Sequence, residues 1–77
     1  MNKKELYEWY ISKLEDSLKN ENFEYINYIL EFLYTSWIIK NNITEIDEIL
    51  QEATLFSELK EEEYKNQAIK LIENFKN

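Results

Sequence analysis

The chain has 77 residues and a formal net charge of −7, and it contains no Gly, Pro, Val, Cys, His or Arg. The length allows one domain, 1–77, and the lack of Cys and His excludes disulfides and structural zinc sites as sources of stability. Without Gly and Pro a multi-stranded sheet lacks its turn residues, so the composition predicts an all-α bundle of three or four antiparallel helices.

The first two helices are predicted at about 3–19 and 23–40, with Asn20 and Asn22 in the turn between them. The inner stripe of the first holds Tyr7, Ile11, Leu14 and Leu18. The second is rich in aromatic residues and apolar most of the way round, which is typical of a helix covered by several neighbours or by a second copy. Its uncharged run is shorter than the about 20 residues of a membrane span, so no span is predicted.

A third helix is predicted to begin at Thr44, an N-cap residue, and to bury Ile46, Ile49, Leu50, Ala53 and Phe56. Ser57 resembles a second N-cap, so a fourth helix is predicted at about 58–75, after a break at 54–57. The alternative is one long kinked helix across the two segments.

The negative charge is concentrated in residues 41–63, which hold eight acidic side chains against Lys60 alone. Six of these acids form the predicted acidic face: Glu45, Glu48, Glu52, Glu58, Glu61 and Glu62. The first three share one side of the third helix, while Glu58 and Glu61 are expected in the first turn of the fourth, where a helix dipole favours acids. One interpretation is a solvated surface, and the other is a surface that engages a basic partner protein.

The residues absent from the chain also narrow its chemistry. Without His and Cys it lacks the usual general base and thiol nucleophile, so neither an enzyme nor a cofactor site is predicted. Without Arg, and with an acidic balance that repels phosphate, direct nucleic-acid binding is not expected. No apolar signal segment follows the N-terminal lysines, and the predicted location is the cytoplasm.

Two groups of aromatic residues are candidate contact sites. Trp9 lies among polar neighbours on the first helix, and Tyr25, Tyr28 and Phe32 form an outer stripe on the second. Packing over a helix end is the alternative for Trp9. The core or a homodimer seam is the alternative for the other three.

These patterns predict a non-catalytic binding protein. The first hypothesis is a small acidic inhibitor or adaptor of a nucleic-acid-handling protein, in the manner of a DNA mimic. The abundance of Ile, Asn and Lys indicates AT-rich coding, as in a phage or plasmid of a low-GC bacterium. The second is a toxin-neutralising or bacteriocin-immunity-type helical protein, by analogy of fold alone. The third is a structural or regulatory homodimer.

Overall fold

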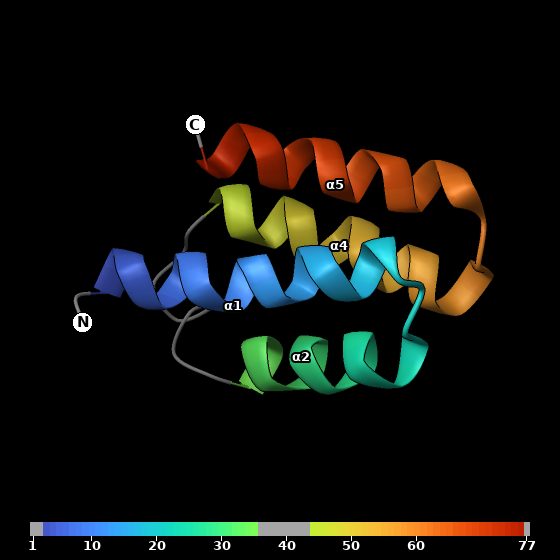
Figure 1. Ribbon diagram of the computed structural model, residues 1–77, viewed down its shortest axis with the longest axis horizontal. Coiled ribbons are helices and arrows are strands. Elements are labelled where there is room, and N and C mark those ends of the chain that lie inside the picture. The colour runs from blue at the N-terminus through green and yellow to red at the C-terminus, as the bar shows by residue number, and fades with distance from the viewer. Residues whose placement is uncertain (1–2, 36–43, 77) are drawn as a thin grey trace.

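The computed structural model describes residues 3–35 and 44–76, with the side chains of 5–35 and 46–76. These residues form four helices: α1 (Lys3–Lys19), α2 (Phe23–Thr35), α4 (Thr44–Leu59) and α5 (Glu62–Lys76). Helix α1 packs against α2 and α5, and α4 packs against the same two helices. Each helix runs antiparallel to both of its packing partners, so the chain forms an up-down-up-down bundle (Figure 1).

The core consists of the apolar stripes that the sequence places on each helix. The predicted inner residues of α1 and α4 are all buried. Helix α2 buries Ile26, Ile29, Leu30 and Leu33, whereas α5 buries only Ala68 and Ile72. The half-buried rings of Phe23, Tyr64 and Phe75 pack around this core. Burial among apolar side chains raises the pKa of the Tyr7 hydroxyl above its usual value of 10.0.

The turn from α1 to α2 is a Schellman motif without glycine. The amide of Glu21 donates to Leu18 O and that of Asn22 donates to Ser17 O. Glu21 takes the left-handed conformation, with φ 52°. Asn22 then caps α2, because its Oδ1 accepts a hydrogen bond from Tyr25 N at 3.2 Å. The prediction of a turn at Asn20 and Asn22 is confirmed, although the positive φ falls to Glu21.

The turn from α4 to α5 lies later than predicted. Helix α4 runs through 54–57, and the chain turns at Lys60, which has φ 56° and donates its amide to Phe56 O. Both the break at 54–57 and the alternative of one long kinked helix are therefore wrong. Ser57 is buried within α4 and its Oγ donates to Asn27 Oδ1 of α2, so it caps no helix.

This shift also moves the charges relative to the helix ends. Glu58 lies in the last turn of α4, and the first-turn acids of α5 are Glu62 and Glu63. The expectation that Glu58 begins a helix is thus wrong. For the second helix, α2 is described to Thr35, and the remaining predicted residues, 36–40, lie outside the described part of the chain.

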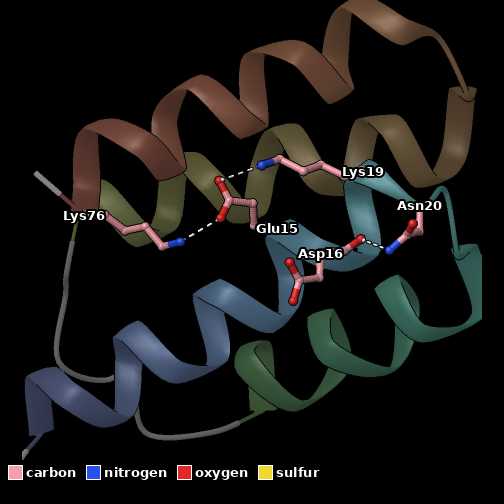
Figure 2. A network of polar contacts seen from close by, with 5 residues as sticks. All are labelled: Glu15, Asp16, Lys19, Asn20 and Lys76. Carbon is pink, nitrogen blue, oxygen red and sulfur yellow. Dashed lines mark hydrogen bonds and ion pairs between the residues drawn. The ribbon is translucent and has the colours of Figure 1, made fainter.

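A buried carboxylate joins the first and last helices. Glu15 on α1 pairs with Lys76 Nζ of α5 at 2.7 Å and with Lys19 Nζ at 3.8 Å (Figure 2). At the other end of the bundle, Lys65 of α5 pairs with Glu21 at 2.9 Å. The hydrogen bond to that carboxylate, with further help from Glu62, raises the pKa of the Lys65 ammonium. Of the four helices described, none is long and apolar enough to cross a membrane.

Candidate protein-docking surface

A groove between α1 and α2 collects most of the exposed aromatic side chains. It has a volume of about 250 Å³ and is lined by Trp9, Tyr10, Lys13, Tyr25, Tyr28, Ile29 and Phe32. We call this surface the aromatic groove. All four aromatic residues predicted as contact sites line it, so the structure unites two groups that the sequence had kept apart.

The rings of the aromatic groove hold one another in place. Tyr10 of α1 stacks on Phe32 of α2 with centroids 4.5 Å apart, and Trp9 meets the edge of Tyr10 at 4.9 Å. Tyr25 and Tyr28 stack at 6.1 Å. Because these contacts exist within the chain itself, the rings are positioned before any partner arrives, which reduces the entropy lost on binding.

The groove rings remain accessible to solvent. Tyr28 is 69% exposed and Trp9 is 47% exposed, while Tyr25 and Phe32 are each about 40% exposed. Large exposed aromatic rings that lie side by side are uncommon on a monomeric protein and are enriched at contact surfaces. Two other exposed apolar side chains, Tyr34 and Leu59, lie outside the groove lining, and Tyr34 shares a hydrogen bond of 3.2 Å with Thr54 of α4.

Acidic side chains border this groove on both sides. Hollows that share its lining residues are edged by Glu5 and Asp16 on α1 and by Glu24 and Glu31 on α2. We call these four exposed carboxylates the acidic rim. Within the described residues, the single cationic side chain of the groove lining is Lys13, whose Nζ lies 5.4 Å from the centroid of Trp9.

The six residues of the predicted acidic face do not share one side of the bundle. Glu48 is exposed and Glu52 half-buried one turn later, opposite the buried inner face of α4. At 3.6 residues per turn, Glu58 lies about 120° around the helix from Glu52. Glu61 is in the turn before α5 and Glu62 begins that helix, where it pairs with Lys65 at 3.5 Å. The side chain of Glu45 lies outside the described residues.

The shape of the groove suits side chains of a protein better than a small molecule. Small-molecule sites are concave cavities of about 300–1,000 Å³ that enclose most of the ligand. The aromatic groove is smaller, and the hollow of about 460 Å³ beside Asn22, Glu24, Tyr25 and Tyr28 is open to solvent. Among the described residues, no group of three or more acidic, His or Cys side chains is arranged to hold a metal ion.

Sequence reasoning missed two members of the groove that join its halves. Tyr10 lies beside the inner stripe of α1, and its stack on Phe32 depends on which helix α1 faces. Ile29 of α2 is buried and lines the groove, and its place there likewise depends on how α1 and α2 pack together. The available signal was that Tyr10 and Trp9 are adjacent, so that a neighbour contacting one ring lies close to the other.

Comparison with known proteins adds nothing to this geometry: no protein-family model, curated protein or solved structure matches the chain.

Proposed function

We propose that this protein is a non-catalytic binding domain that docks a partner protein in its aromatic groove. The observation that carries the proposal is the gathering of Trp9, Tyr25, Tyr28 and Phe32 around one groove, exposed to solvent and held by ring contacts within the chain. Preorganised aromatic rings contribute much of the free energy at many protein interfaces.

The net charge of −7 favours a partner with a basic surface, because opposite charges accelerate encounter and exclude acidic competitors. An inhibitor or adaptor of a nucleic-acid-handling protein is therefore the role we propose first. The carboxylates of residues 46–63 lie on more than one side of the bundle, so we place the contact at the aromatic groove. The carboxylates of residues 46–63 then contribute to the long-range attraction of a basic partner. The cysteine-free composition agrees with the reducing cytoplasm as the compartment of this role.

The test is affinity capture with matched variants. The tagged full-length protein and its Tyr28→Ala variant are expressed in the same cells, and the captured proteins are quantified by mass spectrometry. We expect at least one protein to be enriched by the wild type and reduced by about tenfold or more with Tyr28→Ala, since truncating an interface anchor costs 2 kcal/mol or more.

Tyr34→Ala is the matched control, because Tyr34 is an exposed tyrosine of the same helix that lies outside the groove lining. It should retain the captured protein. Equal capture by wild type and Tyr28→Ala, with both variants folded by circular dichroism, would contradict docking in the groove.

A further inference from the structure

The charges around the aromatic groove restrict what its occupant can be. The acidic rim places Glu24 and Glu31 on α2 and Asp16 on α1. Four salt bridges join Glu15, Glu21 and Glu62 to lysines of the described residues, and none of these four involves Asp16, Glu24 or Glu31. Asp16, Glu24 and Glu31 are thus open to cations supplied from outside the chain.

The groove already holds one cation over an aromatic face. Lys13 Nζ lies 5.4 Å from the centroid of Trp9, within the about 6 Å at which an ammonium group is attracted by a ring. Trp9 therefore offers a cation–π site in this surface. A Lys or Arg side chain of a partner would compete with Lys13 for the same ring.

A second copy of the chain is a poor occupant on the same grounds. In a two-fold dimer the same patch meets itself, so the acidic rim of one copy would face that of the other. Juxtaposed like charges cost several kcal/mol in an interface. A copy of this protein, with its net charge of −7, also meets long-range repulsion during approach.

The spacing of the rim matches a helix. Glu24 and Glu31 are seven residues apart on α2, so they lie on one side of it and about 10 Å apart along its axis. Cations at positions i and i+7 of an incoming helix have the same spacing. Between them, apolar residues at i+3 and i+4 would reach the rings of Tyr25, Tyr28 and Phe32, in the way amphipathic helices occupy grooves.

We propose that the occupant of the aromatic groove is a cationic amphipathic helix of the partner protein. Its apolar stripe packs on the aromatic rings, and its Lys or Arg side chains pair with Asp16, Glu24 and Glu31 of the acidic rim and displace Lys13 from Trp9. This inference rests on the proposed docking function and adds the chemistry of the partner segment.

The test uses two labelled 18-residue helical peptides with the same leucine stripe, one with Lys and one with Glu at every polar position. Fluorescence anisotropy measures their binding to the full-length protein, and NMR shifts of backbone amides map the site. We expect the Lys peptide to bind at least tenfold more tightly than the Glu peptide at low salt, with shifts centred on α1 and α2 around the groove. Added salt should weaken binding of the Lys peptide, because it screens the attraction between the peptide lysines and the rim carboxylates.

Three variants make the test specific. The double substitution Glu24→Lys with Glu31→Lys should weaken binding of the Lys peptide by about tenfold or more, since it reverses the charge of these two rim residues. Glu48→Lys with Glu58→Lys alters the net charge equally on α4 and should have a much smaller effect. Lys13→Met should strengthen binding by about two- to fivefold, because it removes a competitor whose cation–π contact is worth about 0.5–1 kcal/mol.

The inference is overturned if the two peptides bind equally, if neither binds, if the α4 control weakens binding as much as the rim variant, or if Lys13→Met weakens it. It is also overturned if light scattering shows a dimer that dissociates on dilution and is abolished by Tyr28→Ala. Capture that depends on Tyr28 while the Lys peptide fails would leave the docking function standing with another kind of partner segment. Failure of both experiments removes both proposals.

Discussion

Among the described residues, two adopt the left-handed conformation that is most favourable for glycine. Glu21 has φ 52° and Lys60 has φ 56°, and each ends a helix. The conformation costs about 1–2 kcal/mol for a residue with a Cβ atom. Contacts of both side chains offset part of this cost. Glu21 pairs with Lys65 of α5. Lys60 Nζ donates to Ser57 O at 2.8 Å and lies 4.6 Å from the centroid of the Phe23 ring.

At Lys60 the conformational cost can be measured separately from these contacts. Lys60→Ala and Lys60→Gly both remove the side-chain contacts, and only Ala keeps the Cβ atom. We therefore expect Lys60→Gly to be more stable than Lys60→Ala by about 1 kcal/mol in the free energy of unfolding, measured by urea denaturation.

The control for this comparison is Glu58, two residues earlier and still helical. There the order should reverse, with Gly about 1 kcal/mol less stable than Ala, because Gly is unfavourable inside a helix. If Gly were also the less stable residue at position 60, the chain would be helical there and the turn would lie elsewhere.

At the scale of single elements, polar contacts join α2 to α4. Ser57 Oγ donates to Asn27 Oδ1, and Tyr34 and Thr54 share a hydrogen bond through their hydroxyl groups. Ser57 is 7% exposed, so its hydroxyl needs a partner inside the protein. This contact gives Ser57 a role in helix packing, in place of the capping role that its sequence context indicates.

Substitution by Asp distinguishes the two roles of Ser57. An N-cap accepts Asp as readily as Ser, whereas a buried site does not accommodate an unpaired carboxylate. We expect Ser57→Ala to lower the free energy of unfolding by about 1 kcal/mol and Ser57→Asp to lower it by clearly more. Equal stability of Ser57→Asp and the wild type, in urea denaturation, would show that Ser57 begins a helix.

At the scale of the whole molecule, the bundle is closed by contact between its first and last helices. Its radius of gyration is 11.3 Å, close to the about 11.5 Å expected for a compact chain of this length. The side chain of Glu15, on α1, is 9% exposed and pairs with Lys76 of α5. This ion pair links residues that are 61 positions apart, so it stabilises the closed arrangement of all four described helices.

Removing the cation should weaken this closure. We expect Lys76→Met to lower the free energy of unfolding by about 1–2 kcal/mol, because it leaves the buried Glu15 carboxylate with only the more distant Lys19. The partial exposure of Lys76 keeps the loss below that of a fully buried ion pair. Lys70→Met, an exposed lysine of the same helix, is the control and should change stability by less than about 0.5 kcal/mol. Equal effects of the two substitutions in urea denaturation would mean that the Glu15 contact contributes no stability.

Much of the fold follows from periodicity alone, and the errors lie where periodicity carries no information. The bounds of α1 are those predicted, because its apolar stripe ends where Asn20 and Asn22 begin the turn. The start of α5 differs from the predicted one because Ser57 resembles a cap, whereas Lys60, which takes the positive φ, has no such sequence signature. A lysine at the end of a helix is stabilised there by its contacts with Phe23 and Ser57, and these exist only after folding.

The all-α class, the inner residues of α1 and α4 and the concentration of acidic residues can all be read from the amino-acid sequence. Each of these is a local property of composition or of spacing at 3.6 residues per turn. The union of Trp9 with the stripe at Tyr25, Tyr28 and Phe32 in one groove depends instead on how the helices pack. Which side of α1 meets which side of α2 depends on how all the helices share one core, and that choice follows from packing the whole chain.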